Sequence, residues 1–298
     1  MPKNNFGQFC VLSKHFLHWL RCSGLIGSLL LLPCCGSEFL CRSAFAQAVR
    51  TYSSARIWGL AGAETCVTGC GCANANPAAL GVGRRLFAEM SGHSPFGLKE
   101  LTVCRLELGR ADPGQGVAAD IGYMGFDQYQ EGSASCRAAR LLWGRFAVGA
   151  AWRYSWLHIV RYGQYGGHSL ELGLLHQCAP FFSWGAVIKQ PALGKKIQTR
   201  PDAFSSWQIG CRWSAGQPAD CYLEYYRQSP WPGRIRMAME IKWKQILRLR
   251  WGWALEPSIL SFGFGIEQKK VRLDYGVSDH PDLGLTYAMT LCFCRGTP

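Results

Sequence analysis

Large apolar residues alternate with small or charged residues along most of the chain after residue 80. In the segment 145–156 one set of alternate positions is apolar and the other is not: Phe146, Val148, Ala150, Trp152, Tyr154 and Trp156 against Arg145, Ala147, Gly149, Ala151, Arg153 and Ser155. Successive side chains of a β-strand point to opposite faces, so a period of two predicts a strand with two unlike faces. The same alternation recurs in residues 247–256, 260–267, 271–278 and 283–293.

Fourteen segments of this kind follow one another. We place them near residues 84–91, 99–110, 116–126, 135–143, 145–158, 168–177, 181–189, 205–214, 220–227, 235–244, 246–255, 259–267, 270–278 and 283–293. An even number allows a single antiparallel chain to close into a membrane barrel. No apolar run after residue 46 reaches the roughly 18 residues that a membrane-spanning helix needs, so a membrane location would require strands.

The chemistry of the second face separates a membrane barrel from a soluble β-sandwich. A sandwich exposes that face to water, with many Lys, Glu and Thr, whereas here Gly, Ala and Ser stand among Arg and Glu. Small residues and paired charges suit a crowded barrel interior. Tryptophans such as Trp207, Trp213 and Trp243 lie towards segment ends, where membrane barrels carry aromatic girdles. We therefore predict an all-β protein, an antiparallel transmembrane β-barrel with an N-terminal plug; a soluble β domain is the alternative.

Composition agrees with this fold class. Hydrophobic residues make up 48% of the 298 positions and charged residues 17%, which argues against a disordered chain. The chain also contains 12 Trp, 11 Tyr and 15 Phe, which is heavy for a soluble domain and favours a surface that meets a bilayer.

Residues 1–46 have the layout of an export signal. Three lysine or arginine residues precede an apolar core at 25–33, and Ala44-Phe45-Ala46 places small residues at the −3 and −1 positions of a cleavage site. We expect cleavage before Gln47; an uncleaved anchor or a wrongly assigned start codon is the alternative. Export together with strands predicts the cell outer membrane as the location.

Residues 55–80 read ARIWGLAGAETCVTGCGCANANPAAL and show neither a helical nor a strand period. Small residues such as these suit a place where one backbone passes close to another. Pro77 cannot donate a backbone hydrogen bond and restricts Asn76 to extended conformations, so this pair predicts the point where the segment turns into the first strand. We interpret residues 47–80 as a plug segment and residues 81–298 as the barrel.

The plug segment resembles the N-terminal signature of the PorV/PorQ family of outer-membrane β-barrels, relatives of FadL-type transporters, in which Ala-Arg-x-x-Gly-x-x-Gly-Ala leads to Asn-Pro-Ala. The matching residues are Ala55, Arg56, Gly59, Gly62, Ala63, Asn76, Pro77 and Ala78, and Cys66, Cys70 and Cys72 depart from the pattern. Later segments, above all FGFGIEQKKVRLDYGVSDHPDLGLTYAMTLCF near the end, resemble barrel hairpins of the same family. The resemblance implies a plug motif of Arg56, Gly59, Gly62, Asn76 and Pro77.

Charged residues fall mainly on the face that we assign to the barrel interior. The residues expected to line the lumen are Arg145, Arg153, Glu171, Arg212, Glu240, Arg248, Arg250, Glu256, Arg272 and Asp274. Both signs are present, so an internal ladder of ion pairs explains the basic residues better than a nucleic-acid surface does. We expect no nucleic-acid partner.

Enzyme and metal chemistry find little support in the sequence. It contains no Gly-x-Ser-x-Gly, His-Glu-x-x-His or Walker glycine loop, and we interpret Ser169 beside His168 as a polar pair at a loop end. The 15 Cys include no Cys-x2-Cys pair, and the run Cys66, Cys70, Cys72 has no nearby His to complete a zinc site. We expect no catalysis, no metal and no cofactor.

Two functions therefore remain open. The PorV/PorQ resemblance implies a role in type IX secretion, with secretion proteins or exported cargo as partners at the outer membrane. The alternative is a FadL-like passage for hydrophobic small molecules, in which the plug serves as a hatch. Lipid of the outer membrane is the expected partner in either case.

Overall fold

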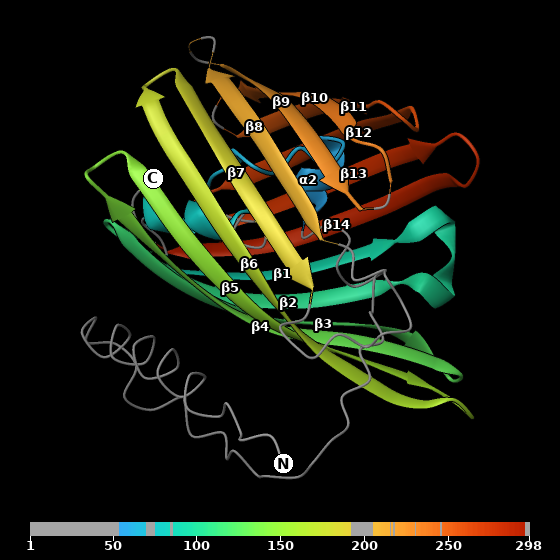
Figure 1. The fold of residues 1–298 in the computed structure, drawn as a ribbon. Coiled ribbons are helices and arrows are strands. Elements are labelled where there is room, and N and C mark those ends of the chain that lie inside the picture. Colours follow the sequence, from blue (N-terminus) through green and yellow to red (C-terminus); the bar gives the residue numbers. More distant parts are fainter. Residues whose placement is uncertain are drawn as a thin grey trace, which may run out of the picture. The chain divides into compact units, whose positions relative to one another are not determined.

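The computed structural model describes residues 54–69, 75–83, 86–191, 205–214, 216, 218–229, 231–244 and 246–295. The predicted export signal at 1–46 lies outside these residues, as do the first residues of the predicted plug. The described strands form a closed antiparallel barrel in which each strand pairs with its sequence neighbours and β1 pairs with β14 (Figure 1). The prediction of a fourteen-stranded barrel is confirmed.

The strands, in chain order, are β1 (Leu86–Ser94), β2 (Val103–Asp112), β3 (Gln115–Phe126), β4 (Tyr129–Leu142), β5 (Phe146–Ile159), β6 (Gly163–Ala179), β7 (Phe182–Pro191), β8 (Ser206–Ser214), β9 (Ala219–Gln228), β10 (Arg234–Trp243), β11 (Leu247–Ala254), β12 (Ile259–Gln268), β13 (Val271–His280) and β14 (Gly284–Arg295). Four short helices accompany them in the described part of the chain: α2 (Ala55–Gly59) and the 3-10 helices η1 (Pro77–Val82), η2 (Pro95–Gly97) and η3 (Lys99–Leu101). Among the described residues, no helix is both long enough and apolar enough to cross a membrane.

Burial alternates along the strands in the sense opposite to that of a water-soluble protein. On β3, Ile121 is 52% exposed, whereas Asp120 beside it is 6% exposed. Large exposed apolar side chains occur on every strand except β4, from Leu86 to Phe293, and buried arginines and carboxylates face the interior. Contact between this apolar surface and water would be unfavourable, whereas contact with the hydrocarbon of a bilayer is not. The distribution of residues therefore suits a barrel surrounded by lipid.

The two ends of the barrel differ in the length of their connections. One end, which we call the short-turn end, has connections of two to four residues at 113–114, 143–145, 180–181, 215–218, 244–246 and 269–270. The other, the long-connection end, joins strands through 95–102, 127–128, 160–162, 192–205, 229–233, 255–258 and 281–283. Outer-membrane barrels keep short turns on the periplasmic side and longer loops outside. For a barrel in the outer membrane, this rule predicts that the long-connection end is the outer mouth.

Aromatic residues gather near both ends on the outer surface. Trp143, Trp213 and Trp243 are exposed at the short-turn end, and Trp207 and Trp231 are exposed at the long-connection end. Amphipathic rings prefer the level of the lipid headgroups, where an apolar body and a polar N–H are both satisfied. The two groups are thus placed as the girdles of a membrane barrel.

Candidate functional site

The described residues before β1, 54–69 and 75–83, lie inside the barrel (Figure 1). Helix α2 packs against β11, β12, β13, β14 and β1, whereas η1 packs against β2 to β6. Ile57 and Leu60 on the first part and Ala78 on the second are completely buried. We call residues 54–83 the plug; the described part of it contacts opposite walls of the lumen.

Close backbone approach explains the small residues of α2. A Cβ atom added to Gly59 would lie 3.1 Å from Cα of Gly263 on β12, and one added to Gly276 on β13 would lie 2.5 Å from the carbonyl oxygen of Ala55. Ala61 and Gly62 then take positive φ values of 52° and 82° and end the helix. Glycine adopts such values without the steric cost that a Cβ imposes. Gly59 and Gly62 of the predicted motif therefore have separate roles, one in packing and one in the turn.

Arg56 attaches the plug to the wall through charge. Its Nε donates to Oε2 of Glu240 on β10 at 2.9 Å and its Nη2 to Oε1 at 2.8 Å, while Nη1 donates to the carbonyl of Thr68 at 2.8 Å. Both partners of the ion pair are buried. A bidentate arrangement away from water is the strongest form of such a pair. Glu240 also accepts from Nε of Arg250 at 2.6 Å.

The charged chain continues along the wall. Nη1 of Arg250 lies 2.8 Å from Oδ1 of Asp274 on β13, and Nε of Arg272 lies 2.7 Å from Oδ2 of the same carboxylate. Glu240 and Asp274 therefore each face two or more guanidinium groups, which compensate the buried negative charge of these two carboxylates. Arg56 is the residue of this row of ion pairs that belongs to the plug.

A second group of contacts holds the middle of the plug. Oε2 of Glu224 on β9 accepts from the backbone N–H of Glu64 at 2.9 Å and of Thr65 at 2.8 Å. Nη1 of Arg236 on β10 donates to the carbonyl of Gly62 at 2.8 Å and to Oε1 of Glu224 at 2.9 Å. Nζ of Lys189 on β7 lies 2.7 Å from Oε1 of Glu64. The plug is thus bonded to β7, β9 and β10 as well as to the strands that α2 touches.

Asn76 and Pro77 fix the second part of the plug. Oδ1 of Asn76 accepts from the N–H of Ala78 at 3.0 Å and caps η1, while Nδ2 donates to the carbonyls of Thr65 at 2.7 Å and Leu174 at 3.2 Å. Pro77 occupies the first turn of η1, where a missing N–H costs nothing. The pair does not lead directly into the first strand, as the sequence suggested: η1 comes between, and β1 begins at Leu86.

Most of the predicted lumen residues do face the interior of the barrel. Those that are buried are Arg153, Glu171, Glu240, Arg250, Arg272 and Asp274, and Arg212 and Arg248 are partly buried. Arg145 and Glu256 are different: both are exposed and lie in connections, before β5 and after β11. For these two the assignment to the lumen is wrong. The alternation of residue types continues in the sequence beyond the ends of the strands, but side chains point alternately inward and outward only within a strand.

Sequence reasoning did not single out a further buried network on β2, β3 and β4. Nη1 of Arg137 lies 3.1 Å from Oε1 of Glu107 and its Nη2 2.5 Å from Oδ2 of Asp120, whose Oδ1 lies 3.2 Å from Nη1 of Arg105. These residues occupy inward positions of the predicted strands, so their parity along the strand would have found them. This network fills the lumen on the side where α2 is absent.

Cys66 has a structural place in the plug. Its Sγ lies 3.2 Å from the carbonyl of Gly210 on β8, and burial raises the pKa of the thiol above its usual range. The described residues contain no group of three or more His, Cys, Asp or Glu arranged to hold a metal ion. Cys66 therefore acts in the structure as a small buried side chain.

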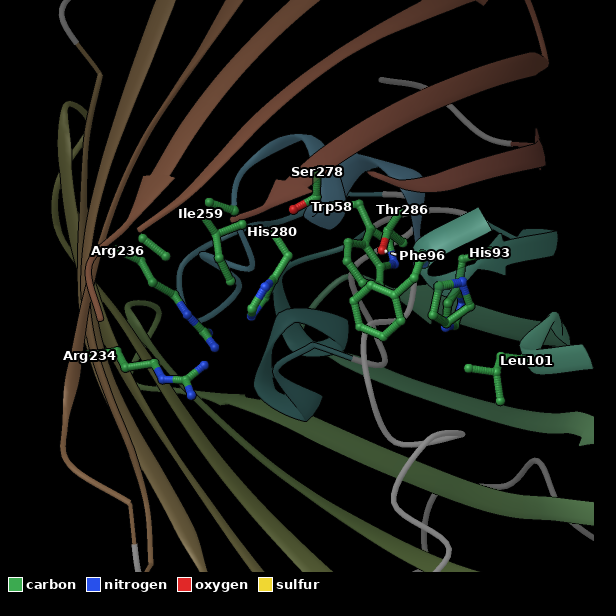
Figure 2. Close-up of a pocket in the computed structure, with 13 residues that line it drawn as sticks. Trp58, His93, Phe96, Leu101, Arg234, Arg236, Ile259, Ser278, His280 and Thr286 are labelled. Atoms are coloured by element: carbon green, nitrogen blue, oxygen red, sulfur yellow. Dashed lines mark hydrogen bonds between the residues drawn. The ribbon is translucent and has the colours of Figure 1, made fainter. Parts of the chain in front are cut away.

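A pocket of about 280 Å³ lies above the plug at the long-connection end (Figure 2). Trp58 and Ala61 of the plug contribute to its lining, together with η2, η3 and the ends of β1 and β10 to β14. The apolar part of the lining includes Phe96, Leu101 and Ile259. Arg234, Arg236, His93 and His280 supply most of its polar atoms. None of these lining residues was predicted as a site, since they come together from parts of the chain that are far apart in sequence.

The barrel is similar in fold to solved outer-membrane channels. The CymD monoaromatic hydrocarbon channel matches with a TM-score of 0.60 at 11% identity, over 83% of this chain and 98% of that one. The P. putida toluene transporter TodX matches with 0.59 at 10%, over 83% and 99%, and a Pseudomonas aeruginosa FadL homologue with 0.58 at 7%, over 81% and 98%. No family model and no curated protein matches the chain in sequence.

At identities of 7–11% these likenesses show the fold alone, a closed fourteen-stranded antiparallel barrel. They do not support the narrower resemblance to PorV/PorQ on which the secretion role was based. The names of CymD and TodX describe a channel and a transporter.

Proposed function

We propose that this chain is an outer-membrane channel for small hydrophobic molecules, with the plug as its gate. The observation that carries the proposal is the pocket at the outer mouth, which is lined by Trp58, Phe96, Leu101 and Ile259 and is bounded below by the plug. An apolar concave site with a few polar groups is the usual form of a binding site for such molecules. The channels with a similar fold carry hydrophobic compounds according to their names, which supports the same function here.

The plug gives the passage its control. A solute that enters the pocket contacts Trp58 and Ala61, and both belong to the segment that Arg56 ties to Glu240. Movement towards the periplasmic side requires this segment to shift, because Ile57, Leu60 and Val67 are buried and share one apolar cluster with Tyr222 and Ala238 of the wall. Ligand binding and plug position are therefore coupled through α2.

Uptake by intact cells tests the function. Apolar solutes partition into phospholipid, so liposomes would give a high background, and the outer membrane of whole cells is the better barrier. Cells that produce the chain should take up radiolabelled p-xylene faster than cells without it. Ile259→Arg places a charge in the apolar lining of the pocket and should abolish most of this gain.

The matched control is Gln128→Arg, which adds the same charge to an exposed turn at the same end of the barrel. It should leave uptake unchanged. If cells with the native chain take up no more p-xylene than cells without it, the proposed function is wrong. Co-purification with secretion proteins in place of uptake would instead revive the role that the sequence resemblance implied.

A further inference from the structure

The pocket above the plug has two sides of different chemistry (Figure 2). The rings of Trp58, Phe96 and His93 form one side. The guanidinium groups of Arg234 and Arg236 extend from the other side, and the imidazole of His280 lies between the two groups of residues. A hydrocarbon cannot accept hydrogen bonds from the guanidinium groups on the second side.

The charge of the pocket is not balanced within its lining. The thirteen described residues that line it include two arginines and two histidines but no aspartate or glutamate. Arg236 is compensated by Glu224 beneath the pocket, at 2.9 Å, and is bonded to the carbonyl of Gly62. Arg234, at the inward-facing start of β10, has no ion pair with any described residue. Among the residues that the structure describes, this half-buried guanidinium group thus has no anionic partner, and an anion in the pocket would supply one.

Ring contacts and one backbone hydrogen bond order the aromatic side of the pocket. Trp58 and His93 have ring centroids 5.4 Å apart at an interplanar angle of 45°, and Phe96 meets His280 edge to face at 6.2 Å. The N–H of Phe96 donates to Oγ1 of Thr286 at 3.1 Å, which fixes the backbone that carries this ring. A cavity of about 150 Å³ holds a benzene molecule. The volume of about 280 Å³ therefore suits one aromatic ring with a polar substituent.

A polar atom on the aromatic side also lacks a partner. His93 is 7% exposed, and its Nε2 makes no hydrogen bond with the described residues. Buried polar atoms without a partner are rare in folded proteins and destabilise them. A ligand with a polar substituent, or water held beside such a ligand, can supply a hydrogen bond here, which a pure hydrocarbon cannot.

We propose that the preferred solute of this channel is a small aromatic carboxylate, with its ring between Trp58 and Phe96 and its carboxylate on the guanidinium of Arg234. The proposal rests on the channel function proposed above and names the substrate class for the same pocket. Arginine binds a carboxylate through two parallel hydrogen bonds, so the ligand is oriented as well as held. The apolar lining around the ring excludes water and strengthens this contact.

Equilibrium dialysis of the purified full-length barrel in detergent tests the assignment with radiolabelled benzoate and radiolabelled toluene as probes. At neutral pH the carboxyl group is ionised, and benzoate should bind more tightly than toluene. Arg234→Gln keeps a polar side chain but removes the guanidinium group and its charge, and should weaken benzoate binding about tenfold to a hundredfold while toluene binding stays the same. Arg234→Lys keeps the charge without the paired donors and should give an intermediate affinity.

The matched control is Arg227→Gln, which removes an exposed arginine from β9 at the same end of the barrel and outside the pocket. It should leave both affinities unchanged. Equal binding of benzoate and toluene, or benzoate binding that does not respond to Arg234→Gln, overturns the aromatic-acid assignment and leaves the hydrocarbon channel standing. If the native chain binds neither probe and raises no p-xylene uptake, the channel function itself fails. Heat-modified migration of each variant on a gel establishes that its barrel has folded.

Discussion

Arg56 is the side chain through which the plug depends on the barrel most directly. Its Nε and Nη2 both donate to the carboxylate of Glu240, which lies 184 positions later in the sequence. The side chains are 5% and 0% exposed, so water cannot replace either partner if the other is lost. Removal of one partner from a buried ion pair typically destabilises by about 3–5 kcal/mol.

We expect Arg56→Met to loosen the plug without unfolding the barrel. The strand pairs do not involve Arg56, and Glu240 retains Arg250 as a partner. Limited proteolysis of the purified barrel, followed by mass spectrometry, should show new cleavage within residues 54–69. Arg110→Met is the control, because the Arg110–Asp112 pair is exposed and contributes less than about 1 kcal/mol. Equal protection of the plug in both variants would contradict the role of Arg56.

The sequence identified Arg56 but not its partner. Alternation along a strand tells which face a residue occupies, and for Glu240 it correctly gave the interior. It does not tell which of the many inward carboxylates a plug residue will meet, because that depends on the height and rotation of the plug inside a barrel that closes only in three dimensions. The same limit applies to the pocket, whose residues come from six strands and three helical turns.

At the scale of elements, glycines on the inner wall match the backbone of the plug. The wall glycines whose added Cβ would strike plug atoms are Gly116, Gly149, Gly173, Gly185, Gly252, Gly263 and Gly276. They occur on strands β3, β5, β6, β7, β11, β12 and β13. The small-residue face that distinguished this chain from a sandwich in sequence is therefore the surface that receives the plug.

A comparison of two inward glycines tests this match. Gly263→Ser would bring a Cβ within 3.1 Å of Cα of Gly59 and 2.9 Å of the carbonyl oxygen of Tyr275, whereas nothing lies within 4 Å of a Cβ at Gly167 on β6. Overpacking of this kind typically costs about 1–3 kcal/mol. Gly263→Ser should raise the protease sensitivity of residues 54–69 and lower the unfolding temperature. Gly167→Ser should change neither, and a similar loss in both variants would show that the plug contact is not the cause.

Strand number was predictable from sequence, but strand length was less so. The predicted segments 135–143 and 168–177 correspond to β4 and β6, which start at Tyr129 and Gly163. The additional residues include Gly132, Gly166 and Gly167 and several polar side chains, which interrupt the alternation. Pairing with β3 and β5 extends these strands nevertheless, because in a closed barrel each backbone group finds its partner on the neighbouring strand whatever the side chain.

At the scale of the whole molecule, the different lengths of the connections at the two ends predict the direction in which the barrel crosses the membrane. The pocket opens at the long-connection end, and both Leu86 and Arg295, which pair where β1 meets β14, lie at the short-turn end. If the usual rule for loop lengths holds, the pocket faces the medium and the barrel termini face the periplasm.

Epitope insertion tests this direction. An epitope placed after Gln128 lies in an exposed turn at the long-connection end, and one placed after Trp143 lies in an exposed turn at the short-turn end. Antibody added to intact cells should bind the first and should reach the second only after the outer membrane is opened. The reverse pattern would place the pocket on the periplasmic side and would exclude uptake from outside as its purpose.

Because the plug touches nearly the whole circumference of the wall, its position constrains the order in which the barrel assembles. Helix α2 and η1 lie against opposite sides, and Glu64 and Thr65 are bonded to β7 and β9 between them. After β1 and β14 have paired, a segment with these contacts could enter only by threading through a closed lumen. We therefore expect the strands to gather around the plug before the final seam forms, so that the first part of the chain acts as a template for the strands that follow it.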